Sequence, residues 1–180
     1  MNLLGISGSL RAGSLNGRLL RLAAESLPGG DSFTVWEGLR SLPHFDQDEE
    51  ASPELAVLGF RAAVAEADAV LIASPEYNGS IPGALKNALD WGSRPQATSA
   101  FRGKPVAVIG ASPGSFGGVW AQGETRRVLG LMGARVVGAE FSLGKAHERL
   151  VEPDDELRTS LLTVIEALGA EVVAGASAAA

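Results

Sequence analysis

The chain has 180 residues, a length typical of one domain, and its 46% hydrophobic and 20% charged residues suffice for a packed core and a hydrated surface. It has no cysteine, which excludes disulfides, cysteine-ligated zinc, iron–sulfur clusters, redox dithiols and a cysteine nucleophile. A net charge of −6 and only 6% aromatic residues disfavour a nucleic acid as partner, whereas glycine is enriched, with 23 residues against an average share of about 7%.

Strands and helices are predicted to alternate along the first half of the chain. Short apolar runs bounded by turn residues indicate strands, and leucine and alanine at four-residue steps indicate helices. The predicted elements are a strand at 3–6, a helix at 18–27, a strand at 33–36, and, after a loop over 37–52, a second helix.

The second predicted helix begins at Pro53, because proline suits the first helical position and Ser52 before it is a suitable cap. Its apolar residues recur at helical spacing. We expect its buried stripe to consist of Leu55, Leu58, Ala62 and Ala65.

The second half of the chain contains two runs, 69–73 and 105–109, that are apolar at every position. Such runs are typical of central parallel strands, which are buried on both faces. The other predicted elements are helices at 82–91 and 119–132, a strand at 134–137, and a final helix from Pro153 that carries Leu157, Leu161, Val164, Ile165 and Leu168.

This alternation predicts an α/β fold with a doubly wound parallel sheet and helices on both faces. Five strands in a chain of this length fit the flavodoxin-like order 2-1-3-4-5 better than the longer dinucleotide-binding fold. In such sheets ligands bind beyond the carboxyl ends of the strands, so the loops after the first, third and fourth strands are the candidate site.

No apolar run approaches the ~20 residues that cross a bilayer, and the first residues lack the basic flank of a signal peptide. We therefore expect a cytoplasmic protein without a membrane partner. One domain is predicted over residues 1–173, followed by a low-complexity, disordered tail over 174–180.

The loop after the first strand is rich in small residues and hydroxyls and opens a helix, whose N-terminus can bind phosphate. Gly8 and Gly13 have the spacing of a P-loop, but Ser14 stands where its lysine would be, which favours a single terminal phosphate over a triphosphate with magnesium. An ordinary polar loop that caps the helix explains this segment equally well.

The loop after the third strand contains Asn78-Gly79, a strong turn signal because both residues tolerate positive φ. Such a turn holds backbone donors and acceptors where a flat heterocycle could meet them, with Tyr77 along the ring. The alternative is a well-specified turn in which Tyr77 only packs. Further along, Lys86 and Asp90 are spaced for a surface ion pair.

The loop after the fourth strand, residues 110–118, has four glycines in nine positions, which allows close approach of its backbone to a ligand. Alone it would be interpreted as a flexible connector. Three small-residue loops at one sheet edge favour one composite pocket.

Together these segments resemble the NAD(P)H-dependent FMN reductases, a family that includes bacterial quinone, chromate and azo-dye reductases of flavodoxin-like fold. The resemblance rests on Gly8-Ser9-Leu10-Arg11 with Ser14 and Asn16, on the segment from Pro75 to Trp91, and on residues 112–118.

The resemblance implies a bound FMN and three groups of binding residues. The FMN phosphate would be held by Ser9, Arg11, Ser14 and Asn16. The edge of the isoalloxazine ring would be surrounded by Pro75, Glu76, Tyr77, Asn78 and Gly79. The other side of the ring would be lined by Ser112, Gly114, Gly117 and Gly118.

In that family NADPH or NADH is the electron donor, and the flavin passes electrons to a small-molecule acceptor: quinones, azo compounds, metal oxyanions or free flavin. The cofactor carries the chemistry, so no protein nucleophile is needed. A backbone N–H of residues 112–118 would stabilise negative charge near flavin N1 and O2. No side chain is assigned as a catalytic acid or base; Tyr77 and a water molecule are both open.

Two departures from the family pattern stand out. Val119-Trp120 occupies a place where quinone and chromate reductases often have a basic residue, and residues 42–46 read Leu-Pro-His-Phe-Asp where Leu-Pro-Leu-Tyr-Asp is frequent. Both segments tend to border the active-site mouth or the subunit interface in the family, so they bear on the acceptor and on the oligomer geometry rather than on the flavin. The resemblance itself implies a homodimer or homotetramer.

Two other classes remain as alternatives. A flavodoxin-type electron carrier would bind FMN without nicotinamide activity, but carriers usually lack an arginine in the first loop and are more acidic. A flavin-binding regulator would have lost the activity. His44 and His147 lie far apart in the sequence, so we expect no metal site.

Overall fold

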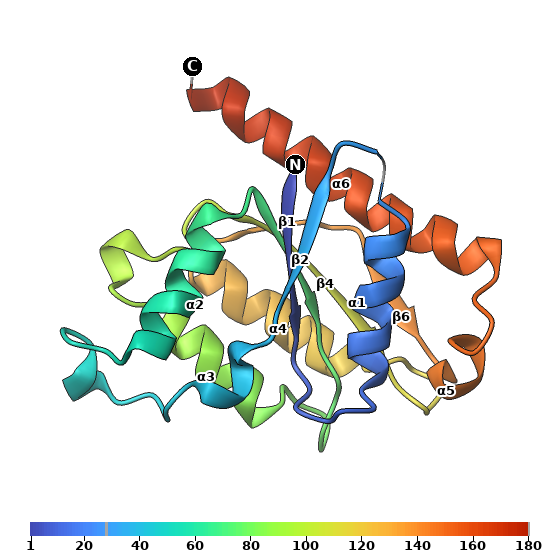
Figure 1. The fold of residues 1–180 in the computed structure, drawn as a ribbon, viewed down its shortest axis with the longest axis horizontal. Coiled ribbons are helices and arrows are strands. Elements are labelled where there is room, and N and C mark those ends of the chain that lie inside the picture. Colours follow the sequence, from blue (N-terminus) through green and yellow to red (C-terminus); the bar gives the residue numbers. More distant parts are fainter. Residues whose placement is uncertain (28, 180) are drawn as a thin grey trace.

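The computed structural model describes residues 1–27 and 29–179, and its centre is a six-stranded parallel sheet (Figure 1). The strand order is β2-β1-β3-β4-β5, with β6 also paired to β4. This confirms the predicted flavodoxin-like order. The strands are β1 (Asn2–Ser7), β2 (Ser32–Trp36), β3 (Ala69–Ala73), β4 (Pro105–Ala111), β5 (Arg135–Val136) and β6 (Phe141–Leu143).

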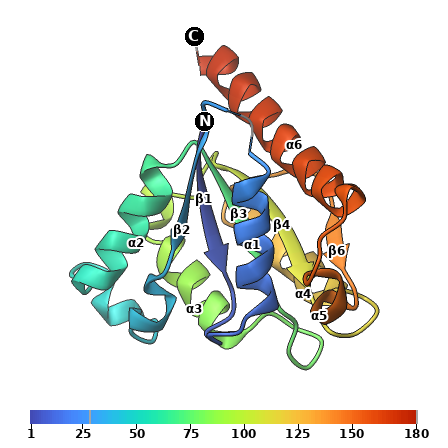
Figure 2. The same cartoon turned by 45° about the vertical axis from the view of Figure 1, so that its right-hand side comes forward.

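Helices cover both faces of the sheet (Figure 2). One core contains residues of α1 (Leu15–Glu25) and α6 (Asp155–Ala179). The opposite core contains residues of α2 (Leu55–Glu66), α3 (Gly83–Gly92) and α4 (Val119–Leu131). The short helices are η1 (Gly38–Ser41), η2 (Gln47–Glu49), η3 (Gln96–Thr98) and α5 (Ala146–Arg149).

The central strands are buried because their side chains supply both cores. Every residue of β3 and β4 is buried. Along β3, Leu71 and Ala73 belong to the core under α1 and α6, whereas Val70 and Ile72 belong to the core under α2, α3 and α4. This alternation is the reason that the two predicted runs have no polar position.

The predicted strand at 134–137 is present as the shorter β5, and a further strand, β6, follows it. β5 pairs with β4 at Val106, and pairing resumes only at Ile109 with β6. The Arg126 guanidinium of α4 donates a hydrogen bond to the Val108 carbonyl (2.6 Å), in the gap between the two pairings. β6 was not predicted, because its apolar alternation of Phe141 and Leu143 is too short to stand out.

The predicted buried stripe of α2 is wrong. Leu55 is 84% exposed, and the other three predicted residues are exposed as well. The helix instead buries the stripe that contains Phe60, whose ring packs against the rings of Trp36 and Phe101 in the opposing core. It also begins two residues late, with Glu54 in the cap position, so Ser52 does not cap it. The buried residues are Val57, Phe60 and Val64.

The last helix, α6, packs on the sheet through the predicted inner face, and all five predicted residues are buried. It continues to Ala179, where the sequence predicts a disordered tail from residue 174; alanine is the strongest helix former, and Ala180 lies outside the described residues. By length and composition alone residues 155–177 would be long and apolar enough to cross a membrane. In the structure only 22% of that window is buried, on the face of α6 that packs on the sheet.

Candidate functional site

The predicted site residues lie in three loops at the carboxyl edge of the sheet, at the bottom of Figure 1. Each loop is numbered by the strand that it follows: the first loop follows β1, the third loop follows β3 and the fourth loop follows β4. The first loop touches the third strand, because the Gly8 N–H donates to the Ala73 carbonyl (2.8 Å). The fourth loop approaches the third, since a Cβ on Gly118 would lie 3.5 Å from the Ser74 carbonyl oxygen. One composite site is therefore formed by segments far apart in the sequence.

The first loop ends in a capped helix. The Ser14 hydroxyl accepts a hydrogen bond from the Gly17 N–H (3.1 Å), so α1 begins at Leu15, three residues before the predicted start. The Ser9 hydroxyl accepts from the Arg11 N–H (3.3 Å), which curls the loop tip. The Arg11 side chain is exposed and forms no ion pair with any residue that the structure describes. It is free to meet an anion at the helix N-terminus.

Asn16, predicted to contact the FMN phosphate, has a different task. Its amide donates to the Ala111 carbonyl (2.9 Å) and accepts from the Ala111 N–H (2.9 Å), and the residue is 2% exposed. Both polar atoms are thus used inside the protein. The side-chain amide of Asn16 thus positions the first loop against the end of β4.

The turn in the third loop is the two-residue hairpin that the sequence predicts. Tyr77 and Ser80 exchange backbone hydrogen bonds of 3.2 and 3.1 Å around the turn. Asn78 and Gly79 both have positive φ, 54° and 73°, as a type I′ turn requires. Tyr77 is 49% exposed at this site, with its ring accessible.

Two carboxylates tie the third loop to α4 in opposite directions. The Glu76 carboxylate accepts hydrogen bonds from the Trp120 and Ala121 N–H groups (3.0 and 3.1 Å). It thereby caps a helix whose own cap residue, Gly118, has no side chain. In return, the Glu124 carboxylate of α4 accepts from the Ser80 hydroxyl (2.7 Å).

This arrangement gives Glu76 a structural partner that the sequence did not reveal, and it adds Glu124 as a positioning residue. The Ser80 hydrogen bond lowers the pKa of Glu124 against partial desolvation, with help from the Ile81 N–H and the positive charges of Arg127 and Lys86. The charged form of Glu124 is therefore the one that holds the loop. No local pattern could have found it, because Ser80 and Glu124 are 44 positions apart.

The fourth loop is held on its other side by the segment from β6 to α5. The Ser112 N–H donates to the Leu143 carbonyl (3.0 Å), and the Gly114 carbonyl accepts from the Lys145 N–H (2.9 Å). Gly117 has a φ of 64°, and a Cβ there would lie 2.6 Å from the Leu143 nitrogen. This glycine, like Gly118 with a φ of 81°, is required by the protein's own backbone.

Between these anchors the tip of the fourth loop presents open donors. The N–H groups of Gly114, Ser115 and Phe116 have no acceptor among residues 1–27 and 29–179. Residues 113–116 are all exposed. These donors occupy the place where the resemblance puts one side of the flavin ring.

The helical part of the segment from Pro75 to Trp91 holds the chain that follows β2. The Pro43 carbonyl accepts from the Asn87 amide (2.8 Å) and from the Trp91 indole N–H (2.9 Å). The Phe45 N–H donates to the side-chain amide oxygen Oδ1 of Asn87 (2.7 Å). Lys86 and Asp90 form the surface ion pair for which they are spaced, with an N–O distance of 2.7 Å.

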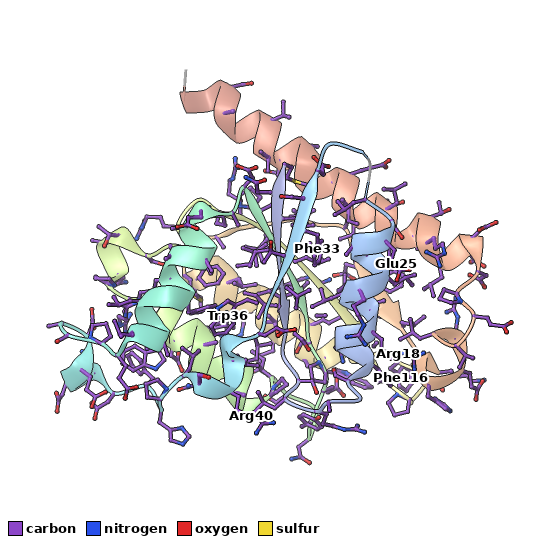
Figure 3. All side chains as sticks on the ribbon, viewed as in Figure 1. Arg18, Glu25, Phe33, Trp36, Arg40 and Phe116 are labelled. Carbon is purple, nitrogen blue, oxygen red and sulfur yellow. The ribbon has the colours of Figure 1, made fainter. Side chains whose placement is uncertain are left out.

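A hollow of about 470 Å³ opens on the β2 side of the first loop. Besides predicted residues of that loop, it is lined by residues of α1, of β2 and of the segment after β2 that the sequence did not single out, because they lie outside the three candidate loops. Figure 3 labels two of them, Trp36 and Arg40, with Arg40 below Trp36 at the lower edge. The main polar and aromatic lining residues are Ser9, Arg11, Ser14, Arg21, Trp36, Glu37 and Arg40.

The histidines do not form a metal site in the part of the chain that the structure describes, where no group of three or more His, Cys, Asp or Glu residues could hold a metal ion. His147 contacts Glu148 at 3.4 Å and is half exposed.

The strand order and the three loops at its carboxyl edge define a protein of the flavodoxin-like class. Residues 1–148 match the family described as NADPH-dependent FMN reductase. An NAD(P)H-dependent FMN reductase of Pseudomonas aeruginosa is 45% identical over 130 residues, which cover 72% of this chain and 69% of that protein. A quinone reductase of Escherichia coli is 35% identical over 149 residues, covering 81% and 78%.

A solved structure supports the same assignment. The flavoenzyme NAD(P)H:(acceptor) oxidoreductase FerB of Paracoccus denitrificans superposes with a TM-score of 0.85 at 30% identity, covering 94% of this chain and 98% of that one. This chain belongs to the NADPH-dependent FMN reductase family.

We expect Asn16→Ala to destabilise the protein, because the Ala111 N–H and carbonyl would remain buried without partners, at about 1–3 kcal/mol each. Chemical unfolding of the FMN-loaded protein measures the change. Asn2→Ala is the matched control: Asn2 is exposed and accepts one hydrogen bond from Ser32, so its loss should change the free energy of unfolding by less than about 0.5 kcal/mol. Equal effects of the two variants would contradict the role assigned to Asn16.

We expect Glu124→Gln to lower the thermal stability of the protein at pH 7 and to have little effect under acid conditions. The folded-state pKa of Glu124 is lowered below its ordinary value of 4.5. Its stabilising contribution is therefore present above that value and is lost as the pH falls through the folded-state pKa. Melting temperatures of both proteins between pH 7 and pH 3.5 measure this, with the exposed Glu152→Gln as control. A difference independent of pH would contradict the assignment.

Proposed function

We propose that this chain is an oxidoreductase that binds FMN at the carboxyl edge of its sheet and uses NADPH or NADH to reduce quinones. Azo compounds, metal oxyanions and free flavin are further acceptors within this proposal. The observation that carries it is the meeting of two open features at one edge: an unpaired Arg11 beside the start of α1, and the free N–H groups of residues 114–116.

The residues present fit the phosphate of FMN. Within the described residues, the Ala12 and Gly13 N–H groups have no acceptor, and both lie directly before the Ser14 cap of α1. Open N–H groups at a helix N-terminus, with a guanidinium beside them, are a suitable anion site even in a chain of net charge −6. Ser9, Arg11 and the backbone of residues 12–14 would hold the phosphate.

The third and fourth loops fit the flavin ring. Tyr77 exposes half of its surface beside the rigid turn, and the two carboxylate ties keep that turn at a constant distance from α4. The free N–H groups of residues 114–116 would donate to a ring edge where negative charge develops. When bound, FMN accepts hydride and releases electrons to an acceptor, which the protein's side chains cannot do.

The names of two relatives support the donor and the acceptor. The Pseudomonas aeruginosa relative is named an NAD(P)H-dependent FMN reductase, and the Escherichia coli relative is named a quinone reductase. In this chain residues 8–14 would bind the FMN phosphate. Residues 74–82 would orient the flavin ring, and residues 112–118 would donate hydrogen bonds to its edge.

A homodimer or homotetramer acting in the cytoplasm is part of the proposal. Phe116 and Trp120 are 65% and 56% exposed, and their rings meet edge-on with centroids 5.1 Å apart. They lie in and directly after the fourth loop, so a second copy that covered them would also enclose the site.

Anaerobic spectroscopy tests this function. The purified protein should show the visible bands of oxidised flavin, lose them on addition of NADPH or NADH, and regain them on addition of a benzoquinone. Bands that resist millimolar amounts of both donors would identify an electron carrier instead. Bleaching without turnover of any acceptor would identify a regulator, and failure to bind added FMN would refute the cofactor.

We expect Arg11→Ala to weaken FMN binding by about 10- to 150-fold, because a charge-assisted hydrogen bond of about 1.5–3 kcal/mol is removed. Fluorescence titration of the flavin-free protein with FMN measures the dissociation constant. Arg102→Ala is the control, since Arg102 is an exposed arginine just before β4, at the opposite edge of the sheet. An unchanged dissociation constant for Arg11→Ala would refute its role.

A further inference from the structure

The hollow on the β2 side of the first loop concentrates positive charge. Arg11, Arg21 and Arg40 line it, and Glu37 is its one acidic lining residue. Arg21 forms no ion pair or side-chain hydrogen bond with the described residues, and its guanidinium lies toward the helix start, 3.9 Å from a Cβ placed on Gly17. In a chain of net charge −6, three guanidiniums around one concavity indicate an anionic ligand.

The hollow is larger than the FMN phosphate requires. Its volume of about 470 Å³ lies within the range of about 300–1,000 Å³ that is typical of small-molecule sites. Val35, Trp36 and Leu39 are apolar lining residues of the same hollow as the arginines. An aromatic side chain together with guanidiniums suits a nucleoside phosphate, because the base can lie against the aromatic ring and the phosphate can pair with the guanidiniums.

Arg21 and Arg40 do not belong to the phosphate-binding loop itself. Arg21 lies one turn further along α1, and Arg40 comes from η1 after β2, where it donates a hydrogen bond to the Leu10 carbonyl (2.8 Å). The other guanidinium N–H groups of Arg40 remain for a ligand. These two residues thus provide positive charge in addition to that at the FMN phosphate. They lie on the side away from the third and fourth loops, which are proposed to contact the flavin ring and are called the ring loops below.

The distance from the hollow to the ring loops suits a dinucleotide. The hollow lies at the ends of β1 and β2, whereas the ring loops follow β3 and β4 in the same sheet. Neighbouring strands are about 4.8 Å apart, so two to three spacings place the hollow roughly 10–15 Å from the ring loops. A nicotinamide at those loops leaves an adenosine end that can extend to the hollow.

We propose that this hollow binds the adenosine 2′-phosphate end of NADPH, with Arg21 and Arg40 at the 2′-phosphate and Trp36 beside the base. NADH lacks that phosphate, so the two arginines would make the chain prefer NADPH. The proposal rests on the proposed function, since it names the donor that the same site uses.

Calorimetry on the FMN-loaded protein tests the site without turnover. The probes are adenosine 2′,5′-bisphosphate, adenosine 5′-diphosphate and inorganic phosphate. The 2′,5′-bisphosphate should bind about tenfold or more tightly than the 5′-diphosphate, and the double variant R21A/R40A should abolish this difference. Arg102→Ala, the exposed arginine at the opposite edge, should retain it.

Steady-state kinetics provides the second readout. In R21A/R40A, kcat/KM for NADPH should fall about tenfold or more, mainly through KM, while kcat/KM for NADH stays within about twofold. An equal fall for both donors would overturn the proposal, as would no fall for either. Phosphate alone binding as tightly as the bisphosphate would overturn the nucleotide assignment.

Two results separate this inference from the proposed function. Loss of FMN from R21A/R40A with unchanged bisphosphate binding would assign both arginines to the flavin phosphate and overturn the inference. A wild-type protein that neither NADPH nor NADH reduces would refute the proposed function, whereas selective bisphosphate binding in the same sample would still support a 2′-phosphate site.

Discussion

The amide of Asn16 and the backbone of Ala111 form the connection on which the candidate site depends. Two hydrogen bonds of 2.9 Å join the first turn of α1 to the last residue of β4 across a sheet in which β1 and β4 are not neighbours. Because β3 lies between them, this connection also fixes where the third loop must leave the sheet. The carboxylates of Glu76 and Glu124 then hold the third loop against α4, the helix that follows the fourth loop. Each of the three loops is thus connected to another by hydrogen bonds.

This arrangement divides the residues that the family resemblance singles out into two groups. Arg11 and Tyr77 expose their side chains at the site and can contact a ligand. Asn16, Glu76 and Gly117 instead hold one loop on another element: Asn16 by its amide, Glu76 by capping α4, and Gly117 by letting the backbone pass close to Leu143. A motif shared by a family therefore records both contacts with the cofactor and the geometry that makes them possible.

The sequence predicts the parts of this protein that local chemistry determines. The two-sided strands β3 and β4 and the Asn78-Gly79 turn follow from burial and from backbone freedom, and the structure confirms them. Helix α2 shows the limit, because its leucine–alanine stripe and its Phe60 stripe have the same spacing, and only the shape of the opposing core decides between them. The same limit applies to polar side chains. Nothing in the neighbouring sequence indicates that Asn16 or Glu76 forms its hydrogen bonds with backbone groups far along the chain.

The pattern of ties also separates two tasks of the site. The ring loops are held by Asn16, Glu76 and Glu124, so a change there moves the geometry around the flavin. The hollow takes its arginines from an exposed turn of α1 and from η1, and neither Arg21 nor Arg40 takes part in those ties. On the proposal that Arg21 and Arg40 recognise the far end of the donor, substitutions there would change donor preference while the Glu76 and Glu124 ties keep the third loop in place. Only the first loop would lose a contact, because Arg40 donates a hydrogen bond to the Leu10 carbonyl.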